Sequence, residues 1–575
     1  MPGGCCRASR RCGLRARLTR TAVLRLVRAH AAQPLDGEHG RERIVDLAAL
    51  RRARALRPPS ARPPPPAPPW SPHQRVPEWE IQLNADIQAC KSAEAVLDLV
   101  MPQLERLSPV NACTALTIMY KRAGGPEATM RLRLDTRFAL LLEHAALTFE
   151  RMQPRNLTAS LYACGKLGIM LPADWLQRYW HVSAPKLDKF VPQHFSNTLY
   201  ACGQLGIVPP VDWSQRFWHA SASKLGEFKP QELSITLYAC GQLGITPPAD
   251  WLQRYWHASA LKLGEFNEQD FSNTLYACGQ LDITPPSDWL QRYWHASALK
   301  LGEFSPQALS NTMYACGQLG ITPPANWLQR YWHASPLKLS DFIPRHFSNT
   351  LYACGQLGTV PPTDWFQRFS DSFERSLPDA NDQDLANTAL SLATLGLWEL
   401  PLWRGLWEQL CHALSLNASE WSAVDQLQAR QLYQAYQAAV VERPGLLSAP
   451  SPELLAAARK SWIDGLATDF NKSSRLHTVV SACLTRMGVA HANERWCERA
   501  ERNIDIVIEG SGARVAVEVD GPSHFLQNGR QDGSTLLRNR MLAAHGWRVV
   551  VVDYWEWEGL QTEAQREEYL RRLLA

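Results

Sequence analysis

Side chains with base-reading chemistry recur along the middle of this 575-residue chain at one fixed interval. A side-chain amide offers a hydrogen-bond donor and an acceptor to the edge of a nucleotide base, and a phenol ring offers a surface for stacking. Four copies place an amide, a tyrosine and a second amide on one face of a helix. The candidate positions are Asn197, Tyr200, Gln204, Asn273, Gln280, Asn311, Gln318, Asn349 and Gln356.

The first amide position is not copied everywhere. It is Ala159 in one copy and Ile235 in another, and Lys166 replaces the second amide once. Variation at an otherwise copied site favours selectivity for different bases. The alternative is that the asparagines cap a helix or brace the neighbouring copy.

Two rows of cations repeat at the same interval and could contact phosphates. One row is Arg178, Arg216, Arg254, Arg292, Arg330 and Arg368, and the other is Lys186, Lys224, Lys262, Lys300 and Lys338. The competing interpretation is a solvated face paired with acids such as Asp250 and Glu265. Beyond the first 70 residues the net charge is −6, which argues against tight binding that ignores sequence.

The interval itself predicts the architecture. The motif FSNTLYACGQL begins at Phe195, Phe271 and Phe347, and its cysteine recurs every 38 residues. These cysteines are Cys164, Cys202, Cys240, Cys278, Cys316 and Cys354. A period of this size indicates one supersecondary unit that buries its apolar face only by stacking on its neighbours. The spacing therefore predicts a solenoid.

Each unit is predicted to be a pair of antiparallel helices. The apolar positions of the first helix are Phe195, Leu199, Cys202 and Leu205, and Gly206 ends it. After a Pro-Pro connector, a second helix runs over residues 212–228 with Asp212 as its cap.

The repeated cysteines and tryptophans are predicted to be packing residues. A metal site requires clustered ligands, whereas the chain has one cysteine per unit and no CxxC motif. The tryptophan pairs are expected to fill the seams between units, with stacking on a base as the alternative. The pairs are Trp175 and Trp180, Trp213 and Trp218, Trp251 and Trp256, Trp289 and Trp294, and Trp327 and Trp332.

The pattern changes near Ile504. The segments IDIVI, RVAVEVD and WRVVVVD predict short buried strands, and a helix is expected over 534–545 with Ser534 as its cap. The predicted domains are a basic, proline-rich segment (1–75), diverged helical repeats (76–155), helix-pair repeats (156–400), diverged helices (401–465) and a small α/β domain (466–575).

The first 70 residues carry fifteen arginines, no lysine and four acids. No acid precedes Asp36, a composition typical of an organelle transit peptide, with a basic arm as the alternative. A chloroplast and a mitochondrion are not separated by this composition. No apolar run reaches the roughly 20 residues that span a membrane. The scattered cysteines favour a reducing compartment.

The NTLYACGQLG and PPADW segments resemble the octotricopeptide repeat of organelle RNA-binding proteins. The closing segments NIDIVIEG, VAVEVDGPSHF and TLLRNRMLAAHGWRVVVVDYWEWEGL resemble a RAP domain, a module often found after such repeats. The resemblance implies work on organelle transcripts: stabilisation, processing, splicing or translation. Arg538 and Arg540 of the RAP-like segment are expected to help hold the RNA.

The RAP fold is similar to that of restriction endonucleases, which implies a second hypothesis. Such a site holds Mg²⁺ or Mn²⁺ between an acid on one strand and an acid-x-Lys pair on the next. Asp505, Glu518 and Asp520 match this pattern except that Asp520 replaces the lysine, and His524 could serve as the base. The alternative is that these carboxylates brace loops.

Together these features predict a mostly α protein: an α-solenoid of 38-residue helix pairs followed by a small α/β RAP domain with restriction-endonuclease-like topology. The predicted function is sequence-selective binding of single-stranded organelle RNA, without a cofactor and with possible protein partners in a ribonucleoprotein complex. The alternatives are a metal-dependent endoribonuclease and a protein-binding helical scaffold.

Overall fold

The computed structural model describes residues 76–415, 421–469, 475–510 and 513–575. The predicted transit peptide and proline-rich linker lie outside these residues. By their contacts, the described residues form an N-terminal unit (76–281 and 285–293) and a C-terminal unit (282–284 and 294–575). No helix within these ranges is long and apolar enough to span a membrane.

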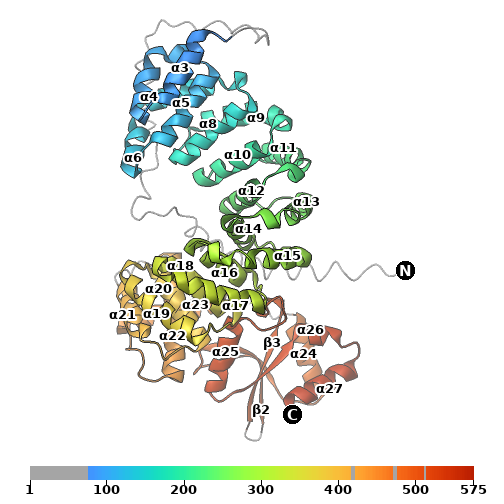
Figure 1. Ribbon diagram of the computed structural model, residues 1–575. Coiled ribbons are helices and arrows are strands. Elements are labelled where there is room, and N and C mark those ends of the chain that lie inside the picture. Colours follow the sequence, from blue (N-terminus) through green and yellow to red (C-terminus); the bar gives the residue numbers. More distant parts are fainter. Residues whose placement is uncertain (1–75, 416–420, 470–474, 511–512) are drawn as a thin grey trace, which may run out of the picture. The chain divides into compact units, whose positions relative to one another are not determined.

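Each 38-residue repeat folds as two helices, as predicted, and Figure 1 shows their alternation within each unit. The first helices are α8 (Pro154–Leu167), α10 (Pro192–Leu205), α12 (Pro230–Leu243), α14 (Glu268–Leu281), α16 (Pro306–Leu319), α18 (Pro344–Leu357) and α20 (Asp382–Leu395). The second helices are α9 (Ala173–Ser183), α11 (Val211–Ala222), α13 (Ala249–Ala260), α15 (Ser287–Ala298), α17 (Ala325–Ala334), α19 (Thr363–Ser376) and α21 (Leu402–Ser415).

Diverged helices precede and follow the repeats. Those before them are α3 (Glu78–Ala89), α4 (Ala93–Val100), α5 (Pro109–Arg122), α6 (Pro126–Leu134) and α7 (Thr136–Leu147), and those after them are α22 (Ala423–Glu442) and α23 (Pro452–Asp469). The predicted helical solenoid is therefore confirmed.

The ends of the repeat helices follow from local chemistry. A proline occupies the first turn of α10, where its missing N–H is not needed, and Gly206 ends the helix in the left-handed region with φ of 64°. The N–H of Ile207 then bonds the carbonyl of Cys202 at 3.0 Å, which satisfies a carbonyl at the helix end. The prediction that Asp212 caps the second helix is wrong, because α11 starts at Val211 after Pro210 and has no side-chain cap.

The first helices pack closely because small residues face each other. A Cβ atom added at Gly317 would lie 2.8 Å from the Cα atom of Ala353 in the next first helix, and one added at Gly241 would lie 3.2 Å from the Cα atom of Ala277. At Gly317 only glycine permits this approach of two backbones, and at Gly241 a methyl group would be tightly packed. The repeated cysteines are buried beside these contacts, as predicted.

The second helices are joined by paired tryptophans, which confirms the seam prediction. The indole N–H of Trp251 donates to Ser221 Oγ of the preceding repeat at 3.0 Å, and that of Trp327 donates to Ser297 Oγ at 3.0 Å. The ring of Trp218 also packs edge to face on Trp251, with centroids 5.2 Å apart. Each junction thus buries an aromatic pair and satisfies its polar atoms.

The C-terminal α/β domain is a four-stranded sheet with helices on both faces (Figure 1). Its elements are α24 (Arg475–Arg486), β1 (Ala492–Cys497), β2 (Arg502–Gly510), β3 (Ala513–Asp520), α25 (Gly533–Ala544), β4 (Arg548–Asp553), α26 (Tyr554–Gly559) and α27 (Glu563–Leu574). The strand order is β1-β2-β3-β4, antiparallel except for the parallel pair β3 and β4.

Two sequence-based details of this domain are corrected. Strand β1 was not predicted, because its segment ANERWC is polar and mostly exposed. The cap of α25 is Asp532, which accepts the N–H of Thr535 at 2.8 Å, and not Ser534.

We expect Gly317→Ala to lower the free energy of unfolding by about 1–3 kcal/mol, because its methyl group meets the rigid backbone of Ala353. Gly203→Ala is the matched control at the same repeat position. Its new methyl group meets only the movable end of Gln242 at 2.6 Å, and the nearest backbone atom is 3.5 Å away. Urea denaturation of the two variants tests this difference, and equal losses would contradict the close-packing argument.

Candidate nucleic-acid interface

The predicted amide and tyrosine positions share one stripe on each first helix. On α10, Phe195 packs on Phe217 of the second helix, with ring centroids 5.2 Å apart. Asn197 and Tyr200 are half-buried and Gln204 is exposed on the other side of α10. The stripe therefore faces away from the second helices and is open to a ligand.

Four of the repeated asparagines have no assigned hydrogen-bond partner among the described residues. Within the described part of the chain, no hydrogen bond is assigned to the side chain of Asn197, Asn273, Asn311 or Asn349, and each is half-buried. Asn387 differs, because its Oδ1 accepts the amide N–H of Gln431 at 2.8 Å. Four of the five repeated asparagines thus keep donor and acceptor atoms free for a base edge.

The tyrosines of consecutive repeats approach one another within each unit. The ring centroids of Tyr162 and Tyr200 are 5.8 Å apart, and those of Tyr314 and Tyr352 are 5.3 Å apart. Lys166 Nζ lies 4.7 Å from the centroid of the Tyr200 ring and 3.0 Å from its hydroxyl oxygen. The stripe thus carries a row of tilted aromatic rings, with a cation at one repeat.

The glutamines are less available than the asparagines. Gln204 is exposed and Gln356 is half-buried, but Gln280 and Gln318 are only 8% and 7% exposed. Gln318 also donates to the hydroxyl of Tyr314 at 3.0 Å. The second amide position is therefore partly used for packing between neighbouring side chains.

The lysine row has a structural role. Lys224 Nζ donates to the carbonyl of Phe190 at 2.6 Å and to that of Asp188 at 2.7 Å. Lys262 donates in the same way to Gly226 at 2.8 Å, in the loop that ends the preceding repeat. These lysines brace successive repeats through loop carbonyls, which corrects the expectation that they form a phosphate-binding row.

The row of arginines lies on the second helices, whereas the amides lie on the first helices. On α11, Trp213, Phe217 and Trp218 are buried, whereas Arg216 is exposed on the face away from the first helices. The exposed members of this row are Arg178, Arg216, Arg254, Arg292, Arg330 and Arg368, and none has an ion pair within the described ranges. The amides and the arginines, which could have contacted the bases and phosphates of one strand, therefore do not share a face within a repeat.

The carboxylates of the α/β domain gather around an arginine. Asp520 and Glu518 lie on β3 and are 0% and 1% exposed. Arg538 of α25 places Nη2 2.7 Å from Asp520 Oδ1 and Nη1 3.3 Å from Glu518 Oε2. Asp505 Oδ2 accepts the backbone N–H of Val519 at 2.8 Å. Arg538 is thus the counter-ion of the cluster and is not available to hold RNA.

Other neighbours add hydrogen bonds to the cluster, although Glu518 Oε1 is buried with no hydrogen-bond partner among the described residues. Gln531 Nε2 donates to Asp520 Oδ2 at 2.8 Å, and His524 Nδ1 lies 3.1 Å from Thr535 Oγ1 and 3.7 Å from Asp520 Oδ1. The pKa of Glu518 is raised to about 8, mainly by burial; the charge of Arg538 opposes this shift, and the charges of Asp505 and Asp520 add to it.

This arrangement does not fit a divalent metal ion. The arginine occupies the space between Glu518 and Asp520 where a cation would bind, and Asp505 is committed to the backbone of β3. No group of three or more His, Cys, Asp or Glu side chains in the described ranges is placed to hold a metal ion. The cluster instead links β3 to α25.

Helix α25 also joins the domain to the repeats of the same unit. Arg540 donates to the carbonyl of Thr394 at 2.8 Å and pairs with Glu442 at 2.5 Å. A Cβ atom added at Gly533 would lie 1.7 Å from the carbonyl oxygen of Gly355 in α18, so glycine is required there. Arg540 therefore holds the domain on the ends of the first helices, in place of the expected contact with RNA.

The preceding loop adds contacts that the sequence did not reveal. The backbone N–H of Gln527 donates to the carbonyl of Gly320 at 2.9 Å, and Asn528 donates to Thr322 Oγ1 at 3.1 Å. Arg530 lies 3.4 Å from the carbonyl oxygen of Gly358. These residues have no repeated spacing, so only the folded chain shows that they meet the repeat connectors.

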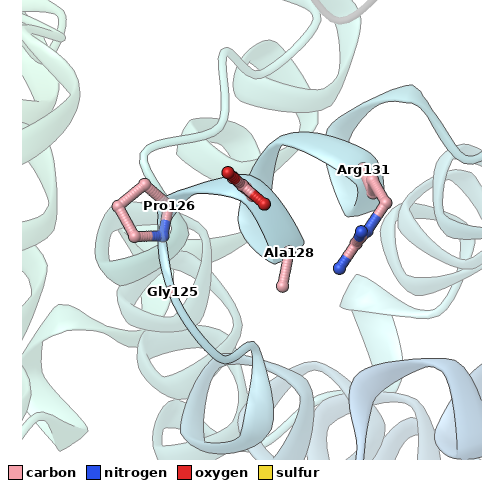
Figure 2. A pocket seen from close by; sticks show the side chains of 5 residues that line it. Gly125, Pro126, Ala128 and Arg131 are labelled. Atoms are coloured by element: carbon pink, nitrogen blue, oxygen red, sulfur yellow. The ribbon is translucent and has the colours of Figure 1, made fainter.

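A separate hollow near the start of α6 contains none of these residues. Gly125, Pro126, Glu127, Ala128 and Arg131 line it, all from a single short segment (Figure 2). Since it combines no side chains from different elements, we assign no site to it.

Stacked helix pairs joined to an α/β domain define a helical-repeat protein with a docked C-terminal module. The module matches the RAP domain family over residues 517–573, and residues 103–268 match the family described as Tbc2 translation factor, C-terminal domain. These matches confirm the predicted resemblance to repeat proteins that carry a C-terminal RAP domain.

A similar protein comes from Oryza sativa subsp. japonica and is described as a RAP domain-containing protein, chloroplastic. It is 31% identical to this chain over 189 residues. The similarity covers 32% of this chain and 28% of the Oryza protein, so the chain spans well under half of that relative.

The buried Glu518 predicts a specific dependence of stability on pH. Its pKa is raised from 4.5 to about 8, so the native state binds more protons than the unfolded state between these values. Stability contributed by this group is therefore present below about pH 4.5 and is lost as the pH rises towards 8. Glu518→Gln should become more stable relative to the parent chain as the pH increases, measured by urea denaturation, whereas exposed Glu558→Gln should show no such trend.

The position of Arg538 between the carboxylates leads to a prediction about how the protein responds to divalent metal ions. Because a fixed cation already neutralises the carboxylates, Mg²⁺ or Mn²⁺ should leave the melting temperature unchanged, and RNA incubated with the protein and either metal should remain intact. Metal-dependent cleavage that Glu518→Ala and Asp520→Ala abolish without loss of RNA affinity would overturn this assignment and restore the nuclease hypothesis.

Proposed function

We propose that this protein binds single-stranded RNA in an organelle, using the stripe of asparagines and tyrosines on its first helices. The observation that carries the proposal is a set of amides that have no assigned hydrogen bond in the described ranges: Asn197, Asn273, Asn311 and Asn349. They share one repeat position, which Ile235 occupies in the repeat between Asn197 and Asn273. A regular row of free amides suits a regular polymer whose bases are unpaired.

Base contacts, more than phosphate contacts, account for binding in this proposal. The amides provide hydrogen bonds to base edges, and the half-buried tyrosines Tyr200, Tyr238 and Tyr276 provide stacking surfaces beside them. The stripe carries few cations, with Lys166 as the exception. We therefore expect selective binding with a shallow dependence on salt. If each repeat contacts one base, the bound RNA segment is roughly six to eight nucleotides long.

The comparisons support the biological setting of this proposal. The RAP match and the chloroplastic Oryza relative favour an organelle protein, and the chloroplast is favoured over the mitochondrion by that relative's description. The arginine-rich, acid-poor first 35 residues agree with import into an organelle. The role is post-transcriptional control through RNA stability, processing, splicing or translation, and the Tbc2 match favours translation among these.

The test is RNA selection on the full chain followed by affinity measurements on the selected RNA. Asn197→Ala, Asn273→Ala and Asn349→Ala should each weaken binding by about fivefold, equivalent to about 1 kcal/mol, and relax the preference at one base position. Each variant should affect a different position, in the order of the repeats.

Matched controls lie on the second helices. Gln215→Ala, Gln253→Ala and Gln291→Ala remove exposed amides that face away from the stripe and should leave the affinity unchanged. If the asparagine variants select the same RNA with the same affinity as the parent chain, the stripe is not the RNA site.

A further inference from the structure

The outer face of the second helices carries its own repeated stripe, distinct from the proposed RNA site. An arginine, a histidine and a leucine follow at steps of three and four residues. The arginine and the histidine lie on the second helix, and the leucine comes just after that helix ends. The complete copies are Arg254, His257 and Leu261; Arg292, His295 and Leu299; and Arg330, His333 and Leu337.

The leucines of this stripe are unusually exposed. Leu261, Leu299 and Leu337 are 68%, 67% and 75% exposed. Single exposed apolar residues are common, but the same large residue exposed at one position of three consecutive repeats is a surface feature that packing of the repeats does not explain.

In the C-terminal unit, Leu299 and Leu337 border a hollow of ≈850 Å³. Its lining comes from three consecutive repeats and includes Leu299, Leu328, Arg330, His333, Leu337 and Trp365. Aliphatic and indole side chains form an apolar lining, and the guanidinium group of Arg330 and the imidazole of His333 supply the polar groups. Asp364 is the one acidic side chain of the lining.

The charges of the hollow define the chemistry of a ligand. Arg330 is exposed, with no ion pair in the described part of the chain. A ligand that buries Leu299 and Leu337 must present apolar side chains, and one that satisfies Arg330 must also present a carboxylate. An acidic amphipathic helix combines both groups on one face.

We propose that this hollow, the outer groove, is a docking site for an acidic amphipathic segment of a protein partner. The partner's leucine or phenylalanine side chains pack between Leu299 and Leu337, and its carboxylate pairs with Arg330. RNA fits this surface less well, because phosphates would engage the arginine but would leave the exposed leucines in water. The groove lets the protein hold RNA on its first helices and a protein on its second helices.

The experiment selects random linear peptides on the immobilised full chain and counter-selects on the Leu337→Glu variant. We expect the recovered peptides to be acidic, with apolar residues at helical spacing. The affinity of one such peptide should fall about tenfold or more in Leu299→Glu and in Arg330→Glu. Val211→Glu is the control, because Val211 is 72% exposed on a second helix but does not line the groove.

RNA affinity measured on the same variants separates this proposal from the proposed function. Leu299→Glu and Leu337→Glu should have the same RNA affinity as the parent chain. This expectation holds whether or not the parent chain proves to bind RNA. Recovery of basic peptides, or of none that depend on Leu337, would overturn the proposal. Competition between RNA and the peptide for Arg330 would also overturn the proposal, because RNA would then be the occupant of the groove. Self-association of the chain that is lost in Leu337→Glu would overturn it too, because the occupant would then be a second copy of the chain.

Discussion

The close approach of successive first helices is the constraint on which the repeats depend. Gly241 and Gly317 let the backbone of one helix lie against an alanine of the next, and the buried cysteines fill the space beside them. Because the first helices are packed through this edge and through their contact with the second helices, one stripe of each remains open. The repeated asparagines occupy that stripe, so the packing that stabilises the repeats also determines which side chains lie on the open face.

A second constraint fixes the RAP domain. Arg538 pairs with the buried carboxylates of β3, while Arg540, two residues further along α25, bonds the carbonyl end of α20. One helix therefore carries an ion pair to the sheet through Arg538 and a hydrogen bond to the last repeat through Arg540. The carboxylate cluster, which resembles part of a hydrolytic site in sequence, acts here as an anchor. Its energetic value lies in pairing two buried charges that would otherwise be costly.

The repeats were largely predictable from the sequence, and the roles of their charged residues were not. The positions of Trp251 and Cys240 recur at a fixed spacing, so their burial follows from periodicity alone. The lysine row has the same periodicity, yet Lys224 bonds loop carbonyls of the preceding repeat, which depends on the angle between repeats. Arg540 meets Thr394, 146 residues away, and no local pattern encodes that contact.

The identical junctions have a consequence for how such proteins change in length. Each junction pairs an indole with the serine of the preceding repeat, as in Trp251 with Ser221 and Trp327 with Ser297. If a duplication or deletion adds or removes one whole repeat, every new junction finds the same partners in the same places. Copy number can therefore change by recombination without compensating substitutions, and the length of the stack changes in single steps with it.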